Sequence, residues 1–247
     1  MREPSIALES GVDGRLVQKL SHVQTLYKNL DIALESDMAR NILQDRDGMK
    51  YISPVAGYEL PNDSVRIPGA GRPYRRDTTD SIHHGWDIMA PYGTPVQSLA
   101  KGKVIRIINN WSWADFKRLK IGNLTQDDEA ENLNIYRGNQ IWLQTMDGNV
   151  TFYSHLSAIS SDITVGSMVE AGTTMGNIGT SGVPDKNYKN IHLHFEIQEN
   201  PFLENEKNPS YLNIMRWNYI GEHMSANHVR EVVREKFNQG HYEIVKE

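Results

Sequence analysis

The chain has 247 residues, of which 38% are hydrophobic and 23% charged, a composition that suits a globular chain of one large or two modest domains. No stretch approaches the roughly 18 apolar residues of a membrane-spanning helix, and 26 basic against 31 acidic residues without a basic block argue against a nucleic-acid binder. The absence of cysteine excludes disulfides, iron–sulfur clusters, cysteine nucleophiles and thiolate zinc sites. A metal site would therefore use carboxylates and some of the nine histidines.

Residues 1–45 form the predicted N-terminal helical segment. Apolar residues recur at spacings of four and three from Leu16 to Leu34, which is an a/d heptad stripe. An amphipathic helix over 12–44 that packs on its own domain is favoured, and a short coiled coil that binds a second copy or a partner protein is the alternative. No signal-peptide core is visible, so the protein is either cytoplasmic or trimmed of an export signal.

Residues 46–209 form the predicted central domain, with an antiparallel β-sheet and hairpin core. Hairpins are expected about Lys101–Gly102 and about Asp147–Gly148, where turn residues separate two apolar runs. Residues 110–138 lack strand alternation and are predicted to be an inserted loop with a short helix.

Residues 210–247 form a predicted C-terminal helical extension. Ser225 is the expected N-cap, and an apolar face follows it from Val229 to Phe237. The fold class is thus mainly β in its core, and α+β overall with helices at both termini.

One strand carries a pair of histidines. In the segment 191–197, the apolar residues share one face, and His192, His194 and Glu196 share the other. The two imidazoles are roughly 6 to 7 Å apart at Cα, so both can reach one small site. Two surface histidines on a solvated sheet are the alternative, because the motif is short.

Two further elements carry side chains of the same chemistry. His83 and Asp87 are four residues apart, and a bend at Gly85 would bring them to one ion. His155 ends the strand that follows the Asp147–Gly148 turn.

A catalytic zinc takes three protein ligands, often two histidines and a carboxylate, and keeps one position open for water. His83, Asp87 and either His192 or His194 supply that set. The spare histidine and His155 remain for proton transfer and for stabilising an oxyanion.

The motifs together resemble those of the lysostaphin-type zinc metallopeptidases, which cut peptidoglycan cross-links. The matching segments are HHGWDIMAPYGTPV at 83–96, YSHLS at 153–157, a glycine-rich run at 165–182 and HLHFEI at 192–197. The resemblance implies one zinc ion per chain, held by His83, Asp87 and His194, with His155 and His192 as the catalytic histidines.

The function implied by this resemblance is zinc-dependent hydrolysis of cross-links or stem peptides in bacterial peptidoglycan. Such a substrate places the protein outside the cytoplasm, in the periplasm, the cell envelope or the medium. One alternative is a catalytically silent member of the family that scaffolds or activates cell-wall enzymes. Another is a zinc peptidase that acts on a peptide from outside the wall.

Several residues around these motifs are open to two interpretations. Glu196 is either a partner for an imidazole N–H or a solvated carboxylate. Tyr74 and Arg75 are candidate contacts for substrate, although a solvated cluster is favoured. His84 is expected to point away from His83, and the insert 110–138 and the loop 183–190 are expected to form walls of the substrate groove. The remaining histidines are expected at the surface: His22, His223, His228 and His241.

Overall fold

The structure is a computed structural model that describes residues 51–72, 81–204, 211–215 and 218–237. The chain divides into two compact units, Met1–Gly48 and Met49–Glu247, and all described residues belong to the second. The predicted helix over 12–44 lies outside the described residues and stays a prediction, as do the predicted domain boundaries. No helix among the described residues is both long enough and apolar enough to cross a membrane.

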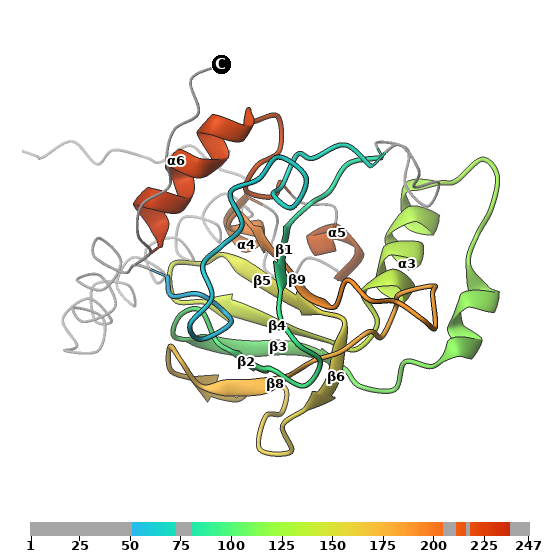
Figure 1. Cartoon of the computed structure of the whole chain (residues 1–247), viewed down its shortest axis with the longest axis horizontal. Coiled ribbons are helices and arrows are strands. Elements are labelled where there is room, and N and C mark those ends of the chain that lie inside the picture. Colours follow the sequence, from blue (N-terminus) through green and yellow to red (C-terminus); the bar gives the residue numbers. More distant parts are fainter. Residues whose placement is uncertain (1–50, 73–80, 205–210, 216–217, 238–247) are drawn as a thin grey trace, which may run out of the picture. The chain divides into compact units, whose positions relative to one another are not determined.

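Two antiparallel sheets form the centre of this unit (Figure 1). The larger sheet has six strands in the order β1-β9-β5-β4-β3-β7. These are β1 (Trp86–Met89), β9 (His192–Gln198), β5 (Val150–Ser154), β4 (Gln140–Thr145), β3 (Gly102–Ile108) and β7 (Met168–Val169). The smaller sheet has the order β2-β8-β6, with β2 (Pro95–Gln97), β8 (Thr174–Ile178) and β6 (Leu156–Ile159). The mainly β fold predicted from the sequence is therefore confirmed.

Strand β9 divides its side chains between two faces, as its alternation predicts. Leu193, Phe195 and Ile197 are fully buried in the main hydrophobic core. His194 and Glu196 lie on the opposite face and are also buried, although both are polar. Because buried polar groups need partners, this second face must be covered by other polar side chains rather than by solvent.

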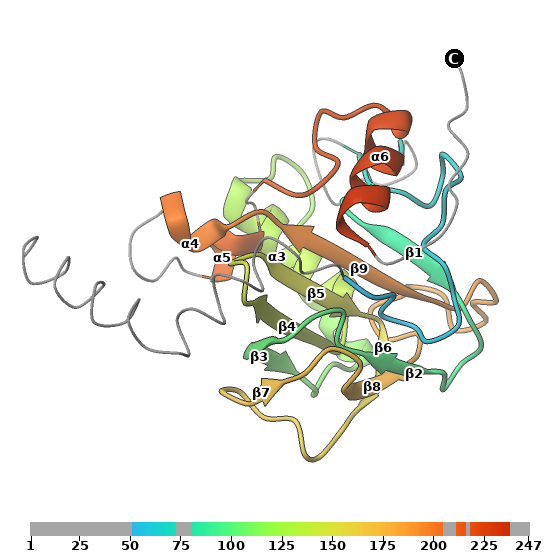
Figure 2. The same ribbon diagram turned by 90° about the vertical axis from the view of Figure 1, so that its left-hand side faces the viewer.

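Helix α6 (Ala226–Lys236) covers β1 and β9, as Figure 2 shows. Ser225 caps it by accepting a hydrogen bond from the backbone N–H of His228, as predicted. Phe237 then makes edge contacts with Trp86 of β1 and Phe195 of β9. Two shorter helices precede it, α4 (Pro201–Glu204) and α5 (Tyr211–Met215).

Of the two predicted hairpins, one forms and one does not. The Asp147–Gly148 turn joins β4 and β5, and Gly148 takes the positive φ of 91° that such a turn requires. The hairpin expected about Lys101–Gly102 is wrong, because β2 pairs with β8 and β3 pairs with β4 and β7. Gly102 has no positive φ; it lets the backbone of β3 approach that of β4, where a Cβ would lie 2.5 Å from the Gln144 carbonyl oxygen.

The insert contains more helix than the sequence analysis expected. A 3-10 helix η1 (Trp113–Arg118) is followed by the twelve-residue helix α3 (Gln126–Arg137). Thr125 and Asp128 form a capping box at the start of α3, and three acidic residues occupy its first turn. These local signals favour a helix start, and they outweigh the high polarity that suggested a loop.

Candidate metal centre

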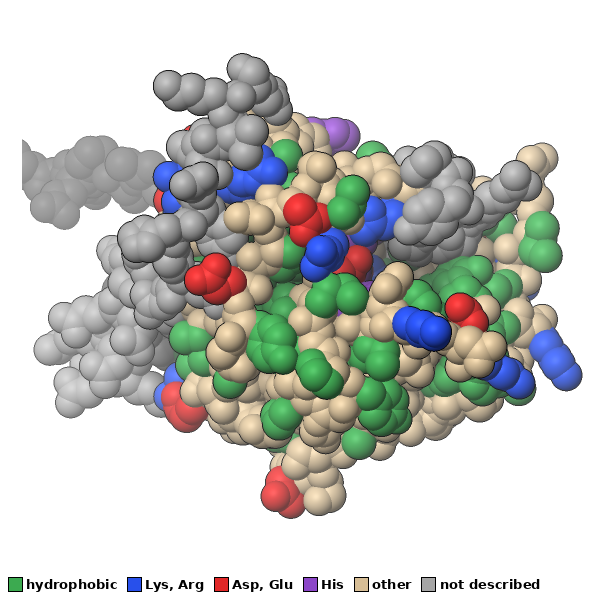
Figure 3. Space-filling model, in the orientation of Figure 1, with side chains coloured by type: hydrophobic (Ala, Val, Ile, Leu, Met, Phe, Trp, Pro, Cys, Tyr) green, Lys and Arg blue, Asp and Glu red, His purple; other side chains and the backbone are tan. Residues whose placement is uncertain are grey.

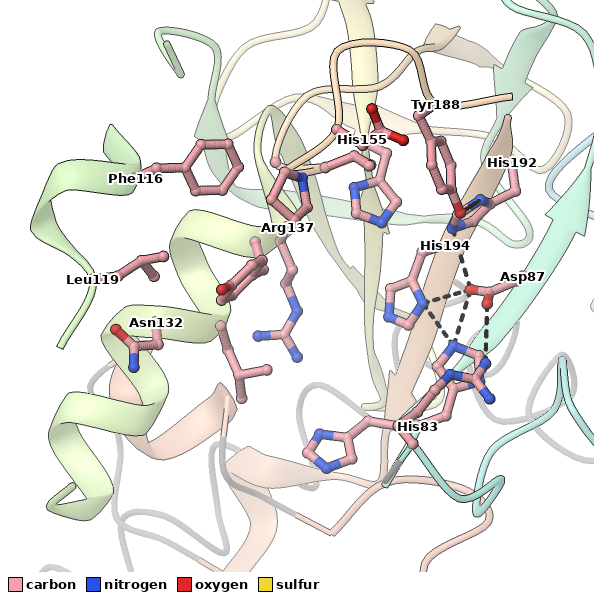
Figure 4. Close-up of a pocket in the computed structure, with 18 of the residues that line it drawn as sticks. His83, Asp87, Phe116, Leu119, Asn132, Arg137, His155, Tyr188, His192 and His194 are labelled. Carbon is pink, nitrogen blue, oxygen red and sulfur yellow. Dashed lines mark hydrogen bonds and ion pairs between the residues drawn. The ribbon is translucent and has the colours of Figure 1, made fainter. Parts of the chain in front are cut away.

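Three side chains converge where β1 and β9 run side by side (Figure 4). His83 Nε2 lies 2.9 Å from Asp87 Oδ1 and 3.0 Å from His194 Nδ1, and His194 Nδ1 lies 2.9 Å from Asp87 Oδ1. Within the described part of the chain, this is the one group of three or more His, Cys, Asp and Glu residues that can hold a metal ion.

The bend at Gly85 brings His83 back toward Asp87, as the spacing required. Position 85 requires glycine because it has no room for a side chain, and not because of its backbone conformation. A Cβ there would lie 2.2 Å from the Phe195 carbonyl oxygen. His83 itself is held by backbone hydrogen bonds to Gly69 and Ala70. The reversal of the chain at Gly85 and its close contact with β9 therefore bring the side chains of His83 and Asp87 together.

The outer ring nitrogens fix how the two imidazoles point. His83 Nδ1 lies 3.1 Å from the Ile67 carbonyl oxygen, and His194 Nε2 lies 2.8 Å from Glu196 Oε1. Because both partners only accept, these outer nitrogens are donors, and a metal ion bound beside Asp87 would take the lone pairs of His83 Nε2 and His194 Nδ1. Two imidazole nitrogens and a carboxylate directed at one point are a donor set that suits zinc.

His155 and His192 stand beside this group and are held in a similar way. His192 Nδ1 lies 2.7 Å from the Asn190 carbonyl oxygen, and His155 Nδ1 lies 2.8 Å from that of Ser181. Their rings are 5.0 Å apart, and His192 Nε2 lies 3.5 Å from Asp87 Oδ1. Both histidines thus keep Nε2 as the nitrogen that can exchange a proton.

The electrostatics of the group differ from one side chain to the next. Burial lowers the pKa of His194, but the hydrogen bonds to Asp87 and Glu196 outweigh it and raise that pKa. Burial raises the pKa of Asp87, but the neighbouring His83 and His192 outweigh it and hold that pKa well below its usual value. Burial lowers the pKa of His83, and burial together with His192 and His194 lowers the pKa of His155 far below its ordinary value. At neutral pH, Asp87 is therefore ionised, and His83 and His155 are neutral.

Glu196 is not a solvated carboxylate, because only 2% of its side chain is exposed. It accepts from His194 and forms a bidentate ion pair with Arg137, the last residue of α3. Burial raises the pKa of Glu196, but Arg137 and His194 outweigh it, and the net pKa is lowered. No local pattern in the sequence links Arg137 to a residue 59 positions away, so this ion pair was not predicted.

Arg72 is a second arginine beside the metal group that was not predicted from the sequence. Arg72 Nη2 lies 3.3 Å from Asp87 Oδ2, the carboxylate oxygen that faces away from the histidines. The predicted candidates Tyr74 and Arg75 lie outside the described residues. His84 stacks on Tyr219 with ring centroids 4.6 Å apart and lines the same cavity as the metal group. His223 and His228 are exposed, as predicted, and His22 and His241 lie outside the described residues.

The group opens into a cavity of about 820 Å³. In Figure 3, histidine is seen at the bottom of a hollow flanked by apolar side chains. The insert lines one side through Phe116, Leu119 and Ile121, and the loop 183–190 lines another through Pro184 and Tyr188. The predicted position of both segments beside the site is confirmed.

Parts of the sequence match a protein family and known proteins. The model of Peptidase family M23 matches residues 81–209. The chain is 28% identical over 101 residues to the L-Ala–D-Glu endopeptidase of Bacillus subtilis (strain 168), which covers 41% of this chain and 24% of that protein. It is 28% identical over 131 residues to the cell division protein DipM of Caulobacter vibrioides (strain NA1000 / CB15N). This match covers 53% of this chain and 17% of that protein. The chain thus spans a quarter or less of the length of these curated relatives.

A solved structure with similarity to this one is the catalytic domain of the antimicrobial peptidase lysostaphin from Staphylococcus simulans. The two share 28% sequence identity, with 58% of this chain and 90% of that chain covered, and the TM-score is 0.38.

Proposed function

Because the chain belongs to peptidase family M23, we propose that it is a zinc-dependent endopeptidase that hydrolyses cross-links or stem peptides of bacterial peptidoglycan. The observation that carries the proposal is the convergence of His83 Nε2, Asp87 Oδ1 and His194 Nδ1 within 3.0 Å of one another. Two further histidines stand beside them with a nitrogen free for proton transfer. The named relative from Bacillus subtilis is an endopeptidase, which supports the reaction class.

His83, Asp87 and His194 would hold the zinc ion. When bound, zinc would act as a Lewis acid toward a peptide carbonyl and a water molecule. Asp87 supplies the negative charge of the ligand set, and its remaining oxygen is held by Arg72. Glu196 keeps the proton of His194 on Nε2, so that Nδ1 stays available as a ligand.

In the proposed reaction, water adds to the amide carbon and the C–N bond breaks. His192 accepts the proton of the water at Nε2, since its Nδ1 is engaged by the Asn190 carbonyl. The Nδ1 proton of His155 is donated to the Ser181 carbonyl, so its Nε2 must first take up a proton released by the attacking water. Protonated there, His155 stabilises the developing oxyanion or passes that proton to the leaving amine. These two roles are interchangeable on the present geometry, because both rings are held by backbone carbonyls.

Digestion of purified peptidoglycan sacculi tests the proposal directly. The wild-type chain with zinc is expected to release peptide fragments with new amino and carboxyl ends, which mass spectrometry identifies. His194→Ala should release none, whereas His223→Ala, which changes an exposed histidine, should match the wild type. A wild-type chain that binds zinc and cuts no peptide bond would contradict the proposal and favour a scaffold for other wall enzymes. If the protein leaves the sacculi uncut but cleaves peptides that do not come from the cell wall, its substrate is a different one.

The proposed substrate also implies a location outside the cytoplasmic membrane. The relatives, an endopeptidase and a cell division protein, are consistent with work on the cell envelope. Fractionation of the source cells, followed by immunoblotting, should recover the protein with the envelope or in the medium. Recovery with the cytosolic fraction alone would contradict this part of the proposal.

A further inference from the structure

Arg137 and Glu196 form a buried ion pair next to the candidate metal centre. Arg137 Nη2 lies 2.6 Å from both carboxylate oxygens of Glu196, and its Nε lies 3.0 Å from Oε1. The two side chains are only 3% and 2% exposed. Because moving two charges out of water offsets much of their attraction, a pair of this kind is weak evidence for a role in stability alone.

The geometry of Glu196 links this ion pair to a proposed zinc ligand. Its Oε1 accepts from Arg137 and also from His194 Nε2 at 2.8 Å, while Oε2 accepts from Gln198 at 3.1 Å. The ring of His194 is therefore oriented by a carboxylate whose own position is set by the guanidinium. Outer partners of this kind make a ligand more basic and hold its ring in place.

The backbone of Arg137 holds His155, one of the proposed catalytic histidines. His155 N–H donates to the Arg137 carbonyl oxygen at 2.9 Å, and His155 has a positive φ of 61°. Gly138 follows Arg137 and caps helix α3 with a φ of 67°. It lies so close to Ser181 that a Cβ on Gly138 would be 2.4 Å from the Ser181 carbonyl carbon. Ser181 is the residue whose carbonyl holds His155 Nδ1.

We propose that Arg137 is a positioning residue through which helix α3 of the insert organises the metal centre. Its guanidinium fixes Glu196 and thereby His194, and its carbonyl fixes His155. Figure 4 shows Arg137 reaching from the helix toward His194. The inference rests on the proposed zinc site, and it makes the insert part of the machinery rather than only a wall of the groove.

The test compares zinc affinity in full-length variants, measured by competition with a chromogenic chelator. Arg137→Met should bind zinc about 10- to 100-fold more weakly than the wild type, as is typical when an outer partner of a ligand is lost. Arg137→Lys keeps a charge but loses the bidentate contact, so its affinity should fall between the two. Arg230→Met is the matched control, because Arg230 is also buried but bonds to Asn62 and Asn227 of another region.

Arg230→Met should lower the melting temperature and leave zinc affinity unchanged. The visible spectrum of the cobalt(II)-loaded protein should change in Arg137→Met and stay as in the wild type in Arg230→Met. If folded Arg137→Lys and Arg137→Met keep the wild-type zinc affinity and cobalt spectrum, the role of Arg137 is contradicted, whereas the proposed metal site is not. Failure of the wild-type chain to bind zinc would instead overturn the metal site, and this inference with it.

A double variant separates positioning from stability. Arg137→Met leaves the Glu196 carboxylate buried without its cation, which destabilises the fold, whereas Arg137→Met with Glu196→Gln removes both charges. The double variant should recover melting temperature relative to Arg137→Met and keep the weakened zinc affinity, because an amide is a weaker acceptor for His194 than a carboxylate. Recovery of both properties would show that the loss came from folding and would contradict the proposal.

Discussion

Asp87 and His194 lie directly opposite each other on the antiparallel strands β1 and β9, and Asp87 Oδ1 is 2.9 Å from His194 Nδ1. Residues directly opposite in such a pair have their Cβ atoms about 4.5–5.5 Å apart, which allows both side chains to reach one ion. The strand register thus sets the distance between a carboxylate and an imidazole that are 107 residues apart in the chain.

Replacing the carboxylate of this pair should weaken metal binding strongly. In Asp87→Asn the amide keeps the shape but removes the negative charge of the proposed ligand set, so zinc affinity should fall by more than about 100-fold. Inductively coupled plasma mass spectrometry of the purified protein, with chelator competition, measures this. Asp162→Asn, at an exposed aspartate, should retain stoichiometric zinc; unchanged zinc content in Asp87→Asn would refute the ligand assignment.

Replacing a proposed proton-transfer residue should separate catalysis from metal binding. His155→Ala should lower the rate of peptide-bond cleavage by about 10²- to 10⁴-fold, the usual contribution of a positioned acid or base. Zinc content should stay at the wild-type level, because His155 is not in the ligand set. Cleavage at the wild-type rate would show that His155 has no role in the reaction; the control is His228→Ala, at an exposed histidine of α6.

A methyl group at Gly85 should disturb the contact between β1 and β9. Because the added Cβ would lie 2.2 Å from the Phe195 carbonyl oxygen, Gly85→Ala should lower the free energy of unfolding by about 1–3 kcal/mol and weaken zinc binding. Gly71→Ala is the matched control, since a Cβ there meets nothing within 4 Å and its backbone needs no positive φ. Urea unfolding of both variants measures the difference, and equal stabilities would show that the strands can separate without cost.

Ionisation of Tyr153 should make the protein less stable at high pH. Burial raises its pKa to about 12, although hydrogen bonds from Thr151 and Leu99 oppose the shift. The unfolded chain loses this proton near pH 10, so the contribution to stability is complete below pH 10 and falls between about pH 10 and 12. The free energy of unfolding should fall by up to roughly 1.4 kcal/mol per pH unit in this range.

Tyr153→Phe should reduce the fall in stability measured by unfolding between pH 10 and pH 12. Part of the fall should remain, because burial and the neighbouring Asp147 also raise the pKa of Tyr51 well above its usual value. Tyr153→Phe should also cost about 1–2 kcal/mol at neutral pH, because the Leu99 N–H loses the acceptor that it has at 3.1 Å. Tyr92→Phe, at a tyrosine 61% exposed, should leave the fall unchanged. An identical pH dependence in Tyr153→Phe and the wild type would contradict the prediction.

Local chemistry was sufficient to predict several parts of this fold. Alternation in β9 separated core residues from His194 and Glu196, the Asp147–Gly148 dipeptide marked a real hairpin, and Ser225 caps α6. Each of these depends on a few neighbouring residues, through the two-residue period of a strand, the positive φ of a turn glycine or a capping oxygen. The donor types open to a metal followed from composition alone, since the chain has histidines and carboxylates but no cysteine.

Only the tertiary structure decided which distant segments meet. The sequence did not reveal that β2 and β3 belong to different sheets, nor that Arg137 at the end of α3 pairs with Glu196. Strand pairing and buried ion pairs join residues far apart in the chain, so no periodicity or spacing records them. The sequence by itself determined which atoms are available for chemistry, and the packing of β1, β9 and α3 determined which of them lie together, because burial obliges every charged group there to find a partner.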